Sequence, residues 1–242
     1  GNRQYLSPFI IDSTQISYEE KLKKFLSCVL IDDGTIRLIQ KSFDAYLFLS
    51  YRKKDRYYAI KLMQLIHKYT THRGIAIWYD EFLVPGENFE KSIQDALDAS
   101  ELFALLVTPN LINESNYVQA IEYPYAHKKK KKILPVEMVK TDKKQLYVQY
   151  PGLPTLVNAY SRELNRAISD KLDGLEICKN KNNPKYCYFM GLAYLEGIDV
   201  EVNKEYAMDL LTKSAKMNYP EAMKKLFYIY SGIKNNKLDR FV

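Results

Sequence analysis

The residues with the clearest potential for chemistry are Ser50, Tyr51 and Arg52, which directly follow a short apolar run, residues 45–49. Runs of this kind, apolar on both faces, are typical of strands in the middle of a parallel sheet. Ligands of an open α/β sheet bind just beyond the carboxyl ends of such strands. The sequence therefore places these three polar side chains where a ligand would bind.

Other familiar catalytic patterns do not occur in the sequence. The three histidines are scattered, and we expect no metal site from them. Cys28, Cys178 and Cys187 lack metal or redox spacing and fit a reducing cytoplasm. The sequence contains no dinucleotide-binding glycine motif, no Walker loop and no Ser-His-Asp set. We therefore expect no bound cofactor, and a nucleotide would be a substrate.

Composition favours a folded protein over a disordered one. Of the 242 residues, 47% are hydrophobic and 27% are charged. No apolar run reaches the length of a membrane span, and the N-terminus lacks a signal pattern, so a cytoplasmic location without a membrane partner is expected. The net charge is +7, to which the five lysines of residues 128–132 contribute much. We interpret them as a solvated loop; no zinc-finger or RNA-binding pattern accompanies them, so nucleic acid is not expected as a partner.

Apolar runs alternate with helical patterns from residue 43 onward. We expect strands over residues 45–49, 75–78, 102–107, 133–136 and 153–157, and helices over residues 55–69, 89–99, 111–127 and 161–175, the last one capped by Ser161. Strands alternating with helices form a parallel, doubly wound sheet. Five strands favour a flavodoxin-like α/β fold, whose switch point lies between the first and third strands.

The pattern before residue 43 suggests an N-terminal extension, residues 1–42. It contains a predicted helix over residues 17–30, in which Ser17 and Glu20 would form a capping box. Residues 32–34 (Asp-Asp-Gly) predict a turn. We assign this extension no chemistry.

The pattern changes again after residue 176. Residues 177–183 are polar and predict a linker, and residues 184–242 carry only helical patterns. We expect helices over residues 185–196, 204–218 and 220–231. The third helix repeats the first at an offset of 36 residues, and a period in this range marks helical-hairpin repeats. The segment would be all-α, and with fewer than three repeats it should pack on the first domain or on a partner.

Four short motifs occur in order between residues 43 and 175. They are residues 43–51 (FDAYLFLSY), residues 78–86 (WYDEFLVPG), the helical set Phe89, Ile93, Ala96 and Ser100, and a last group comprising residues 108–110 (TPN), Ser115, Glu122, Ala126 and residues 133–136 (ILPV). Together they resemble the motifs of Toll/interleukin-1 receptor (TIR) domains. The resemblance implies the flavodoxin-like fold for residues 43–176.

The resemblance also implies an activity. Many bacterial TIR domains cleave NAD+ between nicotinamide and ribose, and their key glutamate corresponds to Glu122. Because nicotinamide leaves as a neutral base, one carboxylate that stabilises positive charge on the ribosyl ring is sufficient. Arg52 would bind a pyrophosphate or orient Glu122. Asp80 and Phe89 flank the loop after the second strand, and Phe89 would stack on a ring of the ligand.

Simpler interpretations of these residues stay open. Glu122 by itself reads as a solvated helical charge, Arg52 as a surface ion pair, Asp80 as a turn residue and Phe89 as part of the core. The sequence also departs from the family pattern. The usual tryptophan before the glutamate is replaced by Val118, with Tyr117 next to it, as if one residue were inserted. Pro124 predicts a helix that is kinked or begins late.

The C-terminal segment resembles a Sel1-like repeat in residues 190–197 (MGLAYLEG), followed by Ala207 and residues 213–215 (KSA). The second copy departs from that pattern, since Phe227 replaces the glycine. Helical repeats present binding surfaces, so this segment is expected to receive a protein partner or trigger.

Three functions remain open at this stage. The first is an NAD+-cleaving enzyme, with nicotinamide and ADP-ribose or a cyclic ADP-ribose as products; it would be activated by TIR self-association, and bacterial relatives of this kind often serve in antiviral defence. The second is a TIR adaptor without activity that works through TIR–TIR contacts. The third is a receptor for a nucleotide signal.

For self-association we expect the loop of residues 80–88 to serve as an assembly surface and gate.

Overall fold

The computed structural model describes residues 31–79, 89–175, 177 and 180–231. The predicted N-terminal helix and the loop of residues 80–88 lie outside these ranges. The chain divides into two compact units. In the described part, residues 44–177 form a sheet unit, and residues 31–43 together with residues 180–231 form a helical unit.

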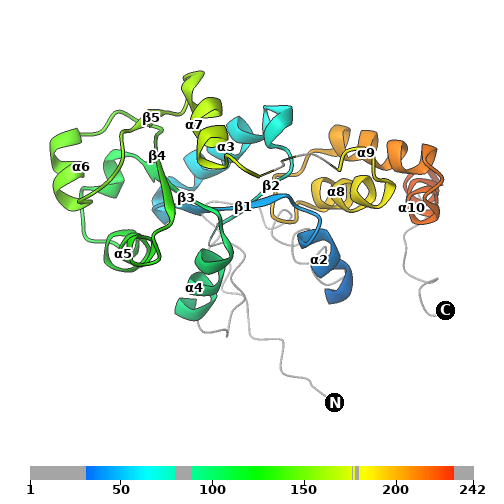
Figure 1. The fold of residues 1–242 in the computed structure, drawn as a ribbon, viewed down its shortest axis with the longest axis horizontal. Coiled ribbons are helices and arrows are strands. Elements are labelled where there is room, and N and C mark those ends of the chain that lie inside the picture. Colours follow the sequence, from blue (N-terminus) through cyan, green and yellow to red (C-terminus); the bar gives the residue numbers. More distant parts are fainter. Residues whose placement is uncertain (1–30, 80–88, 176, 178–179, 232–242) are drawn as a thin grey trace, which may run out of the picture. The chain divides into compact units, whose positions relative to one another are not determined.

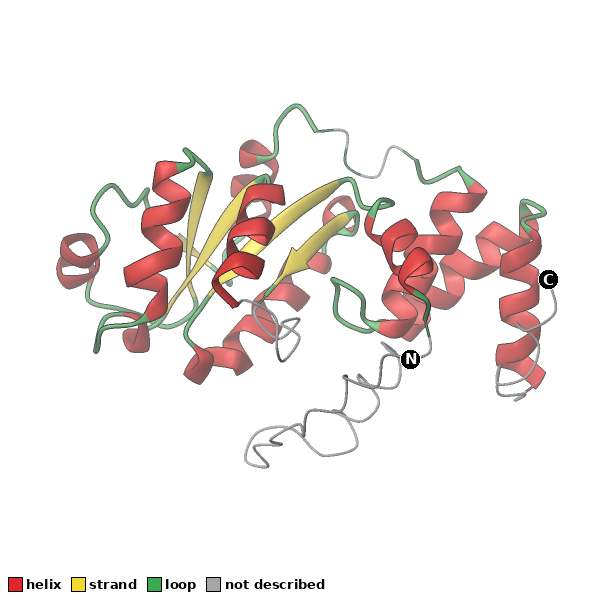
Figure 2. Ribbon diagram, turned by 90° about the horizontal axis from the view of Figure 1, so that it is seen from below, coloured by secondary structure: helices red, strands yellow, loops and turns green. Residues whose placement is uncertain are grey.

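The sheet unit contains five parallel strands in the order β2-β1-β3-β4-β5 (Figures 1 and 2). The strands are β1 (Ala45–Ser50), β2 (Ile75–Trp78), β3 (Leu102–Val107), β4 (Lys132–Glu137) and β5 (Val157–Asn158). This order confirms the predicted flavodoxin-like fold and puts the switch point between β1 and β3.

Two helical layers cover the sheet. One consists of α3 (Arg56–His67) and α7 (Glu163–Lys171); the other consists of α4 (Phe89–Ala99), α5 (Tyr123–Lys128) and α6 (Lys143–Gln149) (Figure 1). Side chains alternate along β1, so Leu47 and Leu49 pack under the first layer. Phe48 faces the second layer, where its ring stacks on Trp78 with centroids 4.6 Å apart. Burial on both faces explains why β1 has no polar face.

Several boundaries differ from the prediction. β5 begins at Val157, because Pro154 cannot donate a ladder hydrogen bond and Leu153 instead closes a turn onto the carbonyl of Tyr150. α7 begins at Glu163 without a side-chain cap, and the hydroxyl of Ser161 donates to the carbonyl of Asn158, so the predicted cap was wrong.

Two further helical segments of the sheet unit depart from the prediction. In place of one helix over residues 111–127, the chain forms the 3-10 turn Pro109–Leu111, the π-helix Val118–Glu122 and α5. α6 was not expected. It is capped by Asp142, whose side chain accepts a hydrogen bond from the N–H of Gln145.

The helical unit consists of α2 (Asp33–Gln40), α8 (Pro184–Glu196), α9 (Lys204–Lys216) and α10 (Pro220–Ser231). The three C-terminal helices confirm the predicted ones. The predicted turn at residues 32–34 was wrong: Asp32 caps α2 by accepting hydrogen bonds from the N–H and the hydroxyl of Thr35. In the described part of the chain, no helix is both long and apolar enough to cross a membrane.

Candidate active site

The carboxyl end of β1 brings Ser50 against Glu122. Ser50 points to the same face of the sheet as Phe48, and its hydroxyl donates a hydrogen bond of 2.5 Å to Oε2 of Glu122. Both side chains are buried: Ser50 is 1% exposed and Glu122 is 7% exposed. A buried carboxylate costs free energy unless hydrogen bonds satisfy it, and Ser50 supplies one of them. Glu122 is therefore not the solvated charge that its sequence context suggested.

A wide helical turn holds Glu122 in this position. Val118–Glu122 is a π-helix, and the N–H of Tyr123 donates to the carbonyl of Val118, five residues earlier. A π-turn contains one residue more than an α-turn and is frequent at functional sites. The π-turn accommodates the extra residue that the sequence has next to Val118, compared with the family pattern. Pro124 falls in the first turn of α5, which continues directly from the π-helix. The helical stretch begins at Tyr117 instead of residue 111, so it begins later than the predicted helix.

Asn116 fastens the start of this π-helix. Its Nδ2 donates to the carbonyls of Leu111 at 2.9 Å and Glu114 at 3.1 Å, and its Oδ1 accepts from the N–H of Gln119. The hydroxyl of the fully buried Tyr150 donates to the same Leu111 carbonyl at 3.3 Å. These bonds tie the loop after β3 to the helix that carries Glu122.

Arg52 also lies at the carboxyl edge of β1, and it pairs with Glu114. Its Nη2 lies 2.6 Å from Oε1 of Glu114, and Nζ of Lys54 lies 2.6 Å from the same oxygen. The Arg52 side chain is 15% exposed, whereas Glu114 is 52% exposed, so the ion pair lies at the surface with the arginine largely covered. Its Nε is buried and has no hydrogen-bond partner in the part of the chain that is described. Lys54 and then Arg52 hold the pKa of Glu114 below its usual value.

Asp55 joins the loops that follow β1 and β3. Its carboxylate is 1% exposed and accepts hydrogen bonds from the hydroxyl of Thr108 at 2.6 Å and from Nδ2 of Asn110 at 2.7 Å. These two strands flank the switch point of the sheet. Asp55 therefore fixes the spacing of the two loops that form the candidate site.

Two tyrosines near Glu122 remain protonated over the whole physiological pH range. Burial raises the pKa of Tyr150 to about 12; the nearby Glu122 charge adds to the rise, and Asn116 and Arg52 oppose it. Burial, followed by the charges of Glu90 and Glu122, raises the pKa of Tyr117. Both hydroxyls therefore retain their protons beside the carboxylate. Tyr117 also packs against the core, in the role expected of it where the family tryptophan is missing.

The other predicted site residues are not all brought to this place. Tyr51 is 7% exposed and packs on the α3 face of the sheet, 6.4 Å from the ring of Tyr79, because alternation turns it away from Ser50. Asp80 lies outside the described residues. Phe89 begins α4, but its side chain is not described. The structure thus unites Ser50 and Glu122 and sets Arg52 at the same edge of the sheet.

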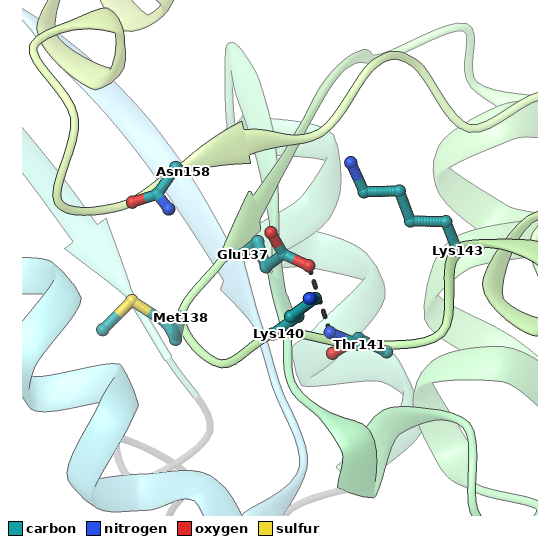
Figure 3. Close-up of a pocket in the computed structure, with 6 residues that line it drawn as sticks. All are labelled: Glu137, Met138, Lys140, Thr141, Lys143 and Asn158. Atoms are coloured by element: carbon teal, nitrogen blue, oxygen red, sulfur yellow. Dashed lines mark hydrogen bonds between the residues drawn. The ribbon is translucent and has the colours of Figure 1, made fainter.

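A separate cavity of about 440 Å³ opens at the carboxyl ends of β4 and β5 (Figure 3). It is lined by Glu137, Met138, Lys140, Thr141, Lys143 and Asn158. The N–H of Thr141 donates to Oε1 of Glu137 at 3.1 Å, which leaves that carboxylate engaged within the cavity wall. None of the predicted site residues lines this cavity, so it lends no support to their roles.

Asp55, Asn116 and Tyr150 belong to the site but were not predicted from the sequence. Asp55 carried one usable signal, since it follows closely on the polar residues that end β1. Asn116 lies within the helix predicted over residues 111–127, so its role in fixing that segment had no signal in the sequence. Tyr150 had none, because it follows the unexpected helix α6 and its partners lie more than thirty residues away.

Comparison with known proteins bears on the same segment. Residues 47–168, half of the chain, match the family model described as TIR domain. No curated protein is similar enough to count as a relative. The matched segment runs from β1 to α7 and includes the switch point, the π-helix and Glu122. The chain therefore belongs to the TIR domain family.

Proposed function

We propose that this protein is an NAD+ glycohydrolase or cyclase that cleaves the bond between nicotinamide and ribose. The observation that carries the proposal is the buried Glu122 carboxylate, held by Ser50 at the carboxyl edge of β1. Family membership supports a TIR-type function in general. The role in bacterial antiviral defence rests on the resemblance and is proposed with it.

In the proposed reaction, the bond between C1′ of the ribose and the nicotinamide nitrogen breaks, and its electron pair stays with nicotinamide. Positive charge develops on the ribosyl ring, and the Glu122 carboxylate stabilises it. Water then adds to C1′ and releases a proton, which gives ADP-ribose; a ring nitrogen of the adenine in place of water would give a cyclic product. A ribose hydroxyl would replace Ser50 as hydrogen-bond donor to Glu122.

The groups around Glu122 fit a dinucleotide substrate. Arg52 and Lys54 supply two cations beside the site, and together they exceed the single negative charge of Glu114. Within the described residues, the N–H at Nε of Arg52 has no hydrogen-bond acceptor. Guanidinium groups bind phosphate oxygens strongly. We therefore assign Arg52 to the diphosphate of NAD+, in competition with Glu114.

The test is Glu122→Gln, which retains the shape of the side chain and removes its charge. Turnover should fall about 10²–10³-fold, the usual cost of removing one electrostatic stabiliser of a transition state. Nicotinamide release from NAD+ by concentrated protein, measured by chromatography, gives the rate. Glu163→Gln is the matched control, because Glu163 is an exposed glutamate on α7 of the same unit. Glu114 does not serve as a control, because it holds Arg52 and Lys54.

Wild-type nicotinamide release by the Glu122→Gln protein would refute the proposal. The second candidate is an adaptor that works through TIR–TIR contacts. It is favoured by the low exposure of Glu122, 7%, since a substrate must open the Ser50 contact to reach the carboxylate. A wild-type protein that does not consume NAD+ even when assembled at high concentration would favour this second function over the first.

A further inference from the structure

The last described helix, α10, exposes a stripe of large apolar side chains. Met223, Phe227 and Tyr230 are 44%, 62% and 75% exposed, and their spacing of four and three residues places them on one side of the helix. α10 packs against α9 through a different side, where Ala222 is fully buried. We call Met223, Phe227 and Tyr230 the α10 stripe. Exposed aromatic groups gathered on one helix face indicate an interaction surface.

The internal repeat shows what kind of element covers such a stripe. α8 and α10 both begin with a proline in the first turn, at residues 184 and 220. At the same offset, the stripe corresponds to Cys187, Gly191 and Tyr194 of α8, and all three are buried. These residues face α9: a Cβ on Gly191 would lie 2.9 Å from Cγ of Leu211, and the ring of Tyr194 lies 4.9 Å from that of Tyr206.

The covering helix on α8 runs antiparallel to it. The end of α8 contacts the start of α9 through Tyr194 and Tyr206, while the hydroxyl of Ser214, near the end of α9, donates to the carbonyl of Pro184. By the same geometry, the α10 stripe fits an antiparallel helix with an apolar face. α10 itself is such a helix, and a two-fold axis perpendicular to it produces an antiparallel pair.

The residue at the point where two helices come closest decides between two occupants of the stripe. One is a second copy of α10, and the other is a further helix of the same chain. α9 approaches α8 closely because position 191 is glycine. Phe227 stands at the corresponding position of α10 and would hold a following helix away from that spacing. Two phenylalanine rings facing each other across a two-fold axis fill the wider gap instead. We propose that α10 is a homodimer contact in which the stripes of two copies pack against each other, with Phe227 at the centre.

The size of this contact predicts a weak association. At about 150–250 Å² per large side chain, exposed fractions of 44%, 62% and 75% give a covered area of about 500–900 Å² in total for the pair. Stable interfaces cover roughly 1,200–2,000 Å², so we expect a dimer with a dissociation constant of about micromolar or weaker. Such a contact would raise the local concentration of the TIR domains. It stands independently of the activity proposed above.

Sedimentation velocity of the full chain over a concentration series tests the association. The double variant Phe227→Ala/Tyr230→Ala should weaken self-association at least about tenfold, since aromatic residues at the centre of an interface commonly contribute more than 1.4 kcal/mol. Glu221→Ala is the matched control: Glu221 is exposed on the same helix, on the side away from the stripe. Circular dichroism verifies that the helices persist. Equal association of the double variant and the control would overturn the proposal.

Crosslinking tests the geometry. In a background with Cys28 and Cys178 changed to serine, Phe227→Cys places a thiol on the two-fold axis and should form a disulfide-linked dimer under mild oxidation. Glu221→Cys, on the side of the helix away from the stripe, should form it much more slowly. Equal crosslinking at both positions would refute the proposed pairing. A Phe227→Cys thiol that fails to react with a bulky reagent in dilute, monomeric protein would also refute it, because the chain itself would then cover the stripe.

Discussion

The sheet unit and the helical unit bury different kinds of groups. At the switch point, the sheet unit encloses connected polar side chains, with Ser50 bonded to Glu122 and Asp55 bonded to Thr108. The helical unit buries mainly apolar side chains and leaves the α10 stripe exposed. Polar groups that are costly to bury are retained where a site needs fixed geometry, whereas exposed apolar groups serve contact. This difference agrees with the two proposals, which put chemistry in the sheet unit and association in the helical unit.

The largest effect on stability is expected at Asp55. Asp55→Ala would leave the buried hydroxyl of Thr108 and the amide of Asn110 without their acceptor. Two orphaned donors should lower the free energy of unfolding by about 2–5 kcal/mol. Asp170→Ala is the control, because that aspartate is 69% exposed in a loose pair with Arg166, and its change should stay within about 0.5 kcal/mol. Urea denaturation measures both; similar values would show that the switch point is not a stability centre.

Acid should weaken the sheet unit through His67. This side chain is buried with Nε2 donating to the carbonyl of Ile75 at 2.8 Å, and burial lowers its pKa to about 4. Below its ordinary pKa of 6.5, the unfolded chain binds a proton that the folded chain rejects. The contribution of His67 is therefore present above pH 6.5 and is lost as the pH falls toward 4, by about 3 kcal/mol in full. Hydrogen exchange of the β2 amides, corrected for the intrinsic rate, should show lower stability at pH 5 than at pH 7. In the His67→Gln protein, this difference in stability between the two pH values should be smaller.

The helical unit should respond to pH with the opposite sign through Asp199. This carboxyl is 6% exposed and accepts a hydrogen bond of 3.2 Å from Gln40, and burial raises its pKa to about 6. Above its ordinary pKa of 3.8, the unfolded chain releases a proton that the folded chain retains. The stabilising contribution of Asp199 is thus present at low pH and is lost as the pH rises from about 4 to 6, by about 3 kcal/mol at most.

The measurement for Asp199 is the exchange of α8 amides over the same pH range. Asp199→Asn retains a neutral side chain of similar shape, so exchange of this variant should lose its pH dependence between 4 and 6. Because Asp199 has a positive φ of 55°, asparagine is also tolerated by the backbone. If the α8 amides of the wild type exchange more slowly as the pH rises through this window, after correction for the intrinsic rate, the assignment is wrong.

The fold of the sheet unit was largely predictable because its signal is local. The wholly apolar β3 and the Gly74 turn before β2 define strands without reference to the rest of the chain. The site was less predictable, since its decisive contacts join distant residues. The Ser50–Glu122 bond spans 72 residues, and only the family resemblance indicated Glu122. The π-helix depends on one extra residue whose consequence is a matter of packing. Tyr150 carried no local pattern for its role, and Asp55 carried only its position close after the polar residues that end β1.

The smallest expected effect tests the internal comparison between Gly191 and Phe227. Gly191→Ala places a Cβ 2.9 Å from Cγ of Leu211, so the Leu211 side chain or the two helices must shift. Overpacking costs about 1–3 kcal/mol, and the better helix propensity of alanine returns about 1 kcal/mol. We therefore expect a net destabilisation of about 0–2 kcal/mol in thermal or urea unfolding.

A double-mutant cycle separates the two contributions. In a Leu211→Ala background the clash disappears, so Gly191→Ala should stabilise the protein by about 0.5–1 kcal/mol through helix propensity alone. The change of sign between the two backgrounds is the signature of close α8–α9 contact. Equal effects in both would mean that the glycine is not needed for the hairpin. Phe227 would then not prevent a following helix from packing on α10, and the case for a second copy at the α10 stripe would lose its main support.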